Sequence, residues 1–215
     1  MQICIDCTAM IKTTALTFQY RKSQPLQFPD MELSKDAVIL GPSGVGKTTL
    51  LHLIGGLLTP TSGQVFINGT NTSILSRFQM DHFRKKHIGI IFQQHHSLRA
   101  LTVFENLLTI NRMGSKNTNT DQLNLLLSEL DLQTVKHKKP NQLSQGQKQR
   151  LSIALALVNE PTLLLADEPT SSLDDINCER AIELLKNEAI KHQSQLIVIT
   201  HDQRVIPHFN QKIAL

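Results

Sequence analysis

The chain has 215 residues, 40% of them hydrophobic, which suits one large domain or a core with a subdomain. No apolar run approaches the roughly 18 residues of a membrane span. The amino terminus lacks the basic start and apolar core of a signal peptide, so we expect a cytoplasmic protein.

The net charge of +4 at neutral pH is mildly basic, and the basic clusters at 84–87 and 136–139 are short. This pattern favours a solvated basic face over a nucleic-acid or anionic-membrane patch, and no nucleic-acid partner is expected. Cys4 and Cys7 form a C-x-x-C with no second pair. That spacing favours two ordinary thiols over a metal site.

In chain order, residues 12–19 suit a strand that ends at Tyr20, and residues 21–30 form a polar loop with two prolines. Residues 37–40 are apolar and partly β-branched, so they predict a buried strand. Residues 49–54 begin a helix.

Between that strand and that helix the sequence fits G-x-x-x-x-G-K-[ST], the phosphate-binding P-loop. The stretch is Gly41, Pro42, Ser43, Gly44, Val45, Gly46, Lys47 and Thr48. Its glycines let backbone N–H groups turn toward phosphate oxygens, and the helix N-terminus adds its positive dipole end. Lys47 is expected to reach the β- and γ-phosphates, and the Thr48 hydroxyl to bind Mg²⁺.

Two further strands are predicted at 64–67 and 88–92, separated by a short basic helix at 78–86. Beyond them, residues 94–149 contain no clear strand, and helices are expected at 102–112 and 121–132. We place a helical subdomain at about 94–149.

That subdomain is inserted into an α/β core. Residues of about 12–93 and 150–215 form this core together with a β subdomain. The whole of 1–215 is expected to be one domain.

The last third of the chain alternates helix and strand. A helix from Ser144 to about Asn159 precedes an apolar strand at 162–167, and a helix at 177–192 precedes the last clear core strand at 196–200. This alternation predicts a mostly parallel sheet covered on both faces, with ligands at the carboxyl ends of its strands.

The candidate site residues all follow strands. Gln93 follows one strand, Asp167 and Glu168 end another, and His201 follows the last. An apolar strand that ends in two acids is the Walker B arrangement. Asp167 is expected to hold Mg²⁺ and Glu168 to activate the attacking water, since phosphoryl transfer depends on positioning and charge neutralisation.

The stretch Leu143-Ser144-Gln145-Gly146-Gln147 resembles the LSGGQ signature of ATP-binding cassette (ABC) ATPases. The resemblance covers about residues 12–205. In order, the A-loop, Walker A, Q-loop, signature, Walker B, D-loop and H-loop of that family resemble Tyr20, Gly41–Thr49, Gln93, Leu143–Gln147, Leu163–Glu168, Ser171–Asp174 and His201.

The resemblance implies a P-loop NTPase core with a parallel sheet, an N-terminal antiparallel β subdomain and an inserted helical subdomain. It also implies a head-to-tail dimer of two copies, with two ATP molecules at the interface. The resemblance implies that the nucleotide is contacted by the P-loop and by Tyr20, Thr49, Ser144, Gly146, Gln147 and Asp174. It also implies that Thr48, Gln93 and Asp167 bind the metal. The catalytic residues that it implies are Glu168, His201 and Gln93.

Within these assignments, Tyr20 stacks on adenine, Gln93 senses the metal and water, His201 contacts the γ-phosphate and Asp174 links the two sites. The family usually has glycine where this chain has Gln145. The flanking serine and glycine remain, so activity is expected to survive.

Three stretches resemble the subgroup of lipoprotein-release and macrolide-export ATPases: 83–94, 101–106 and 165–170. That subgroup pairs with a separate transmembrane permease, so the resemblance implies an exporter or lipoprotein-release system. It also implies a location on the inner face of the membrane.

The resemblance further implies that a permease helix docks near residues 94–110. The apolar side chains there either line that groove or form the helical core: Leu98, Leu101, Val103, Phe104 and Leu107.

Two other classes of protein also contain a P-loop. A P-loop kinase or GTPase would not carry a signature-like stretch at 143–147. A non-transport ABC protein of similar size, such as an iron–sulphur assembly ATPase, stays open as the alternative.

Overall fold

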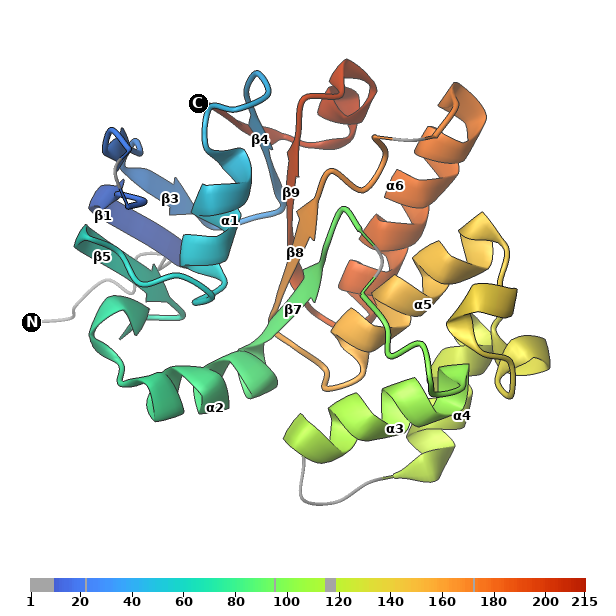
Figure 1. The fold of residues 1–215 in the computed structure, drawn as a ribbon. Coiled ribbons are helices and arrows are strands. Elements are labelled where there is room, and N and C mark those ends of the chain that lie inside the picture. Colours follow the sequence, from blue (N-terminus) through green and yellow to red (C-terminus); the bar gives the residue numbers. More distant parts are fainter. Residues whose placement is uncertain (1–9, 22, 95, 115–118, 172) are drawn as a thin grey trace, which may run out of the picture.

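A parallel sheet of five strands forms the centre of the computed structural model, which describes residues 10–21, 23–94, 96–114, 119–171 and 173–215 (Figure 1). The strands lie in the order β10-β4-β9-β8-β7, and each neighbouring pair is parallel. Their bounds are β4 (Ala37–Leu40), β7 (Ile88–Ile91), β8 (Leu163–Asp167), β9 (Gln195–Thr200) and β10 (Gln211–Ala214).

Alternate residues of the central strands enter two different hydrophobic clusters. Ile39 and Leu165 pack on one face, whereas their neighbours Val38, Leu164 and Val198 pack on the other. Both faces are covered, which explains why these strands are continuous apolar runs rather than alternating polar and apolar sequences.

The first face is covered by a small antiparallel sheet together with α1 (Lys47–Ile54). Its strands are β1 (Ile11–Phe18), β2 (Leu26–Gln27), β3 (Met31–Leu33), β5 (Ser62–Ile67) and β6 (Thr70–Asn71). The antiparallel β layer and the parallel core agree with the expected fold class.

The second face is covered by helices, which lie on the right of Figure 1. The remaining elements are α2 (Arg77–His87), α3 (Val103–Gly114), α4 (Thr120–Glu129), α5 (Gln145–Leu157) and α6 (Asp175–Lys191), with short 3-10 turns at η1 (Thr72–Ile74), η2 (Gln133–Val135), η3 (Pro140–Gln142) and η4 (Gln203–His208). Across the described ranges, no helix is both long and apolar enough to cross a bilayer.

Two expectations about elements were wrong. The loop expected at 21–30 contains the two-residue strand β2, and β10 follows what was expected to be the last core strand. Both lie at sheet edges, where one unpaired side leaves room for polar residues such as Gln211 and weakens the apolar signal. Cys4 and Cys7 lie outside the described residues.

The apolar side chains at 98–107 divide between the two uses that the sequence left open. Val103 and Leu107 are fully buried in the helical cluster, and Phe104 packs against it. Leu98 is 51% exposed. Most of this stretch therefore forms core rather than a docking groove.

Candidate functional site

The P-loop connects the end of β4 to the first turn of α1, and two of its residues require glycine. Gly44 and Gly46 have φ angles of 85° and 105°, in the left-handed region that favours glycine. Gly46 is the N-cap of α1, and among the described residues no side-chain hydrogen bond caps this end of the helix. The N–H groups of that turn are therefore available to an anion.

Lys47 is the buried cation of this site. Its side chain is 6% exposed, and its ammonium donates to the carbonyls of Gly41 and Pro42 at 2.8 and 3.0 Å. The same Nζ lies 3.6 Å from Oε1 of Glu168. The P-loop and the end of β8 thus meet at one charge, although they are far apart in the sequence.

Glu168 contacts His201 because their strands are neighbours in the sheet. Asp167 of β8 stands opposite Ile199 of β9, so the residues just after the two strands come together. Oε1 of Glu168 lies 2.7 Å from Nδ1 of His201, and Oε2 accepts from the Thr200 hydroxyl at 2.9 Å.

The backbone at Glu168 is in an unusual conformation. Its φ of 48° lies in the left-handed region, which costs a non-glycine residue of order 1 kcal/mol. Its N–H donates to the Ile199 carbonyl at 2.8 Å, which holds the turn in place. Such strain is typical of functional positions.

Asp167 is 3% exposed, and its Oδ1 has no hydrogen-bond partner among the described residues. Burial raises the pKa of this carboxyl above its ordinary value, a hydrogen bond with Thr48 opposes that rise, and the neighbouring Glu168 carboxylate adds to it. A buried carboxylate with an unpaired oxygen beside a threonine hydroxyl suits a hard cation such as Mg²⁺.

Tyr20 stands at the edge of this site with its ring half-exposed, at 46%. Its hydroxyl lies 3.1 Å from Oγ1 of Thr49, and its ring meets Phe18 edge-on with centroids 4.7 Å apart. The hydroxyl and one ring edge therefore have partners inside the chain, while part of the ring surface is open to solvent.

The signature residues begin α5 as a capping box. The Ser144 hydroxyl accepts from the N–H of Gln147, whose side chain accepts in turn from the N–H of Ser144. Ser144, Gln145 and Gly146 are all exposed. A Cβ added at Gly146 would meet no atom of the chain within 4 Å.

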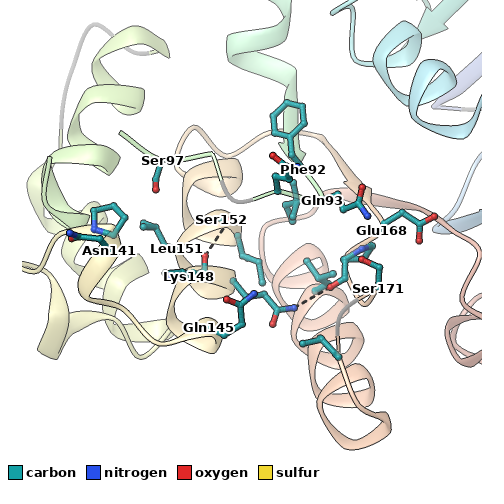
Figure 2. A pocket seen from close by; sticks show the side chains of 18 of the residues that line it. Phe92, Gln93, Ser97, Asn141, Gln145, Lys148, Leu151, Ser152, Glu168 and Ser171 are labelled. Carbon is teal, nitrogen blue, oxygen red and sulfur yellow. Dashed lines mark hydrogen bonds between the residues drawn. The ribbon is translucent and has the colours of Figure 1, made fainter. Parts of the chain in front are cut away.

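A cavity of about 520 Å³ connects the Q-loop to the start of α5 (Figure 2). Gln93, Gln145 and Glu168 line it. Gln149 and Pro169 line it too, and the side-chain amide of Gln149 donates to the Pro169 carbonyl at 3.4 Å. The structure thus brings Gln93 and Glu168 to one cavity. No contact recorded between described residues joins Ser144 or Gly146 to the P-loop.

Sequence reasoning missed a charged network behind the D-loop. The guanidinium of Arg204 binds both oxygens of Asp202, one oxygen of Asp175 and the carbonyl of Leu173. Hydrogen bonds from Arg204 hold the pKa of Asp202 well below its usual range. The signal was available, because Asp202 and Arg204 follow His201 directly at the carboxyl end of β9.

Asp174, expected to link the two sites of a dimer, is the exposed N-cap of α6. The backbone N–H of Asn177 donates to it at 2.9 Å and lowers the pKa of its carboxyl. Ser172, in the same loop, lies outside the described residues.

Comparison with protein families decides what this arrangement of residues is. The model described as "ABC transporter" matches residues 29–171, which span the P-loop, the signature-like stretch and both carboxylates. The chain belongs to the ABC transporter family. It is an ABC-type ATPase, and the expectation of nucleotide binding is confirmed.

Relatives of this ABC ATPase share more than a third of its residues. The "lipoprotein-releasing system ATP-binding protein LolD" of Bacteroides fragilis is 37% identical, and the alignment covers 90% of this chain and 92% of the relative. A LolD protein of Chlorobium chlorochromatii is 39% identical, with 87% and 79% covered.

Solved structures agree with the fold of the ABC ATPase. A bacterial ABC transporter cassette, solved as a dimer, superposes with a TM-score of 0.84 at 32% identity and covers 96% of this chain and 94% of its own. A post-hydrolysis dimer of the same cassette bound to ADP and Pi matches equally well.

Proposed function

We propose that the chain is the ATPase subunit of a lipoprotein-release type transporter. In this proposal it hydrolyses ATP as a head-to-tail dimer and drives a separate transmembrane permease. The observation that carries the proposal is the likeness to LolD proteins along most of both chains. This likeness favours transport over iron–sulphur assembly, the alternative left open by the sequence.

One copy supplies the first half of each ATP site. The N–H groups of the loop from Gly41 to Gly46 and of the first turn of α1 bind the phosphates. Lys47 leaves the Gly41 and Pro42 carbonyls to contact the β- and γ-phosphates. Tyr20 offers its exposed ring surface to adenine, with Thr49 holding the phenol.

Mg²⁺ fits the donor set of this site. The Thr48 hydroxyl and the unpaired Oδ1 of Asp167 would hold it, with Gln93 as a further oxygen donor. The ion, when bound, neutralises charge that develops on the phosphates. Burial raises the pKa of Asp167, and a bound cation would offset this cost of the charged carboxylate.

Glu168 orients and activates the attacking water, and His201 holds it in place. The 2.7 Å contact between Nδ1 of His201 and Oε1 of Glu168 fixes the carboxylate, and the exposed remainder of the imidazole faces the γ-phosphate. Both side chains are present and in contact, which supports an active rather than a degenerate site.

A second copy supplies the other half through Ser144, Gly146 and Gln147. Glycine lowers helix stability relative to alanine, and among the described residues no atom would clash with a Cβ at position 146. A glycine at this position is explained if an external group has to approach the backbone closely. The exposed N-terminus of α5 presents its N–H groups to that group, the γ-phosphate.

The permease docks in an apolar cavity of about 420 Å³ between α2, β7, α3 and α5. Its apolar lining includes Leu57, Phe92, Ile110, Met113 and Leu155, of which Met113 is 59% exposed. Of its lining residues, His96 and Ile110 lie within the stretch 94–110 that was expected from the sequence. Docking here keeps the ATPase on the inner face of the membrane.

The test is an affinity pull-down from detergent-solubilised membranes with the full chain as bait. We expect one multi-span permease to co-purify and Met113→Glu to weaken its capture at least tenfold. Ile74→Glu, at an exposed residue outside the cavity, should capture it normally. Recovery of soluble iron–sulphur assembly proteins without a permease would contradict the proposal. ATP hydrolysis of Met113→Glu without permease should match that of the unaltered chain.

A further inference from the structure

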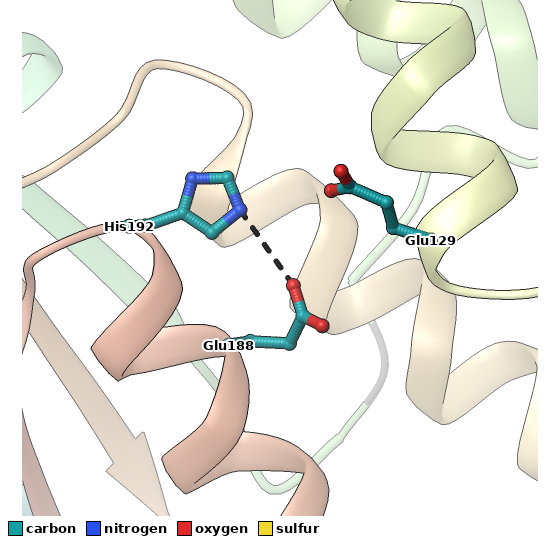
Figure 3. A group of neighbouring side chains, drawn as sticks. All are labelled: Glu129, Glu188 and His192. Atoms are coloured by element: carbon teal, nitrogen blue, oxygen red, sulfur yellow. Dashed lines mark ion pairs between the residues drawn. The ribbon is translucent and has the colours of Figure 1, made fainter.

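Three potential metal ligands converge on the side of the molecule formed by the ends of α4 and α6 (Figure 3). Glu129 ends α4, while Glu188 and His192 lie four residues apart and share one face at the end of α6. One ligand atom from each side chain lies within 4.8 Å of the other two. None of these residues belongs to the nucleotide site.

Two of the three ligand atoms lack hydrogen bonds although they are buried. Glu188 is 7% exposed, and neither its Oε2 nor Nε2 of His192 has a hydrogen-bond partner among the described residues. These two atoms face each other at 3.6 Å, beyond hydrogen-bond distance. An unsatisfied buried polar atom destabilises the folded chain, so two together indicate a missing ligand.

We propose that Glu129, Glu188 and His192 bind a divalent transition-metal ion, with Zn²⁺ as the best match. Zinc binds imidazole nitrogen and carboxylate oxygen at roughly 2.0–2.2 Å in tetrahedral geometry, which sets ligand atoms about 3.4 Å apart. The 3.6 Å separation of Nε2 and Oε2 fits that spacing. A water completes the fourth position.

Glu129 already pairs with a lysine, so its carboxylate has to become available to the ion before the ion can bind. Its Oε1 now lies 2.6 Å from Nζ of Lys191, a side chain that is 47% exposed. The lysine has room to swing into solvent, and the second carboxylate oxygen is free to turn toward the ion. The ion then replaces the ammonium as the positive charge beside two carboxylates and one neutral imidazole.

The position of the site gives the ion a structural effect. α4 packs with α3 in the helical layer, whereas α6 packs on β9 of the central sheet. A bound ion would tie these two parts of the molecule together and raise the melting temperature, since only the folded chain brings the three ligands together.

The experiment measures Zn²⁺ binding to the nucleotide-free, tag-free chain by equilibrium dialysis and elemental analysis, together with thermal unfolding. A Cys4→Ser, Cys7→Ser background removes the thiols at the amino terminus. We expect one equivalent of Zn²⁺ and a higher melting temperature with Zn²⁺. His192→Gln, Glu188→Gln and Glu129→Gln should each weaken binding at least about tenfold, as the loss of even a supporting outer-shell partner does.

His208→Gln is the matched control. His208 Nε2 lies 3.1 Å from Oε2 of Glu179, which is the same kind of His–Glu pair, and no third ligand joins it within the part of the chain that the structure describes. It should keep the full equivalent and the full shift. If His192→Gln and Glu188→Gln both match His208→Gln, a bridging water fills the gap and the metal site is refuted. If Glu188→Gln fails to fold, His192→Gln and Glu129→Gln decide.

Discussion

At the scale of single residues, the site is organised around one buried ammonium. Lys47 is held by two P-loop carbonyls and lies 3.6 Å from Glu168, which contacts His201. Three motifs that are distant in sequence therefore meet through direct contacts. A substitution at any of these residues should affect ATP binding or hydrolysis more than it affects the fold.

Lys47→Ala tests the phosphate contact. Charge-assisted bonds to phosphate are the strongest that a side chain offers here, so affinity for ATP should fall by at least about 100-fold. A fluorescent ATP analogue measures the loss. Lys12→Ala removes an exposed lysine paired with Glu32 and should bind normally. Normal hydrolysis by Lys47→Ala would show that the P-loop assignment is wrong.

Tyr20 separates stacking from hydrogen bonding. Tyr20→Ala should weaken nucleotide binding about 10-fold, because base–aromatic stacking contributes about 1–3 kcal/mol per base. Tyr20→Phe keeps the ring, loses only the contact with Thr49 and should bind almost normally. Titration with ATP and with a triphosphate lacking the base distinguishes them. Equal behaviour of both variants would place adenine elsewhere.

The sequence predicted which residues gather at the ends of the strands but not how they contact one another. Strand ends predicted that Glu168 and His201 share one edge of the sheet. The 2.7 Å contact follows only from β8 and β9 being neighbours in register, a fact about sheet order that local patterns do not contain. The network of Arg204 was missed because two of its partners, Leu173 and Asp175, lie about 30 residues earlier, around the start of α6.

At the scale of elements, the proposed role of the N-terminus of α5 is to contact the nucleotide held by a second copy. Its capping box satisfies the N–H groups of Ser144 and Gln147. Gln145 and Gly146 are exposed beside it.

Gly146→Ala should separate stability from activity. Alanine favours the helix by up to about 1 kcal/mol, and its methyl meets no atom of the chain, so the free energy of unfolding should rise. ATP hydrolysis should fall at least about 10-fold, because the methyl blocks the approach of the second copy. Urea denaturation and a phosphate-release assay measure the two quantities.

Gln122→Ala on the exposed face of α4 is the control for Gly146→Ala. It also increases helix propensity, yet it should leave hydrolysis unchanged. Full activity in Gly146→Ala would remove the argument that an external group approaches this helix.

Asp202, in the turn after β9, should make the free energy of unfolding depend on pH in the acidic range. The pKa of Asp202 is lowered when the chain folds, so its stabilising contribution is complete above its unfolded pKa of about 3.9. It is lost as the pH falls through the lower folded value. Arg204→Gln should destabilise the chain more at pH 7 than at pH 3, as measured by urea denaturation. An equal loss at both values would contradict this.

Most elements could be predicted because the parallel strands are apolar runs and the helices are periodic. The edge strands β2 and β10 could not, since two or four residues with half-exposed side chains carry little pattern. Their pairing depends on β1 and β4, which are distant in the chain.

At the scale of the whole molecule, the central sheet separates a β layer from a helical layer, and the nucleotide residues lie along one edge. P-loop, Walker B and H-loop residues contact one another, whereas the signature residues face solvent. One copy thus holds half of each proposed site. A monomer should bind ATP but hydrolyse it slowly.

The most direct test measures the mass of Glu168→Gln with saturating Mg²⁺-ATP by size-exclusion chromatography and light scattering. Removing the base should slow turnover at least about 100-fold while leaving ATP bound, and should trap a dimer. Glu160→Gln, the same change at an exposed acid, should keep normal turnover and not accumulate a dimer. We predict a stable dimer of Glu168→Gln that needs ATP and disappears when Lys47→Ala is added. A Glu168→Gln chain that binds ATP yet stays monomeric would contradict the shared site.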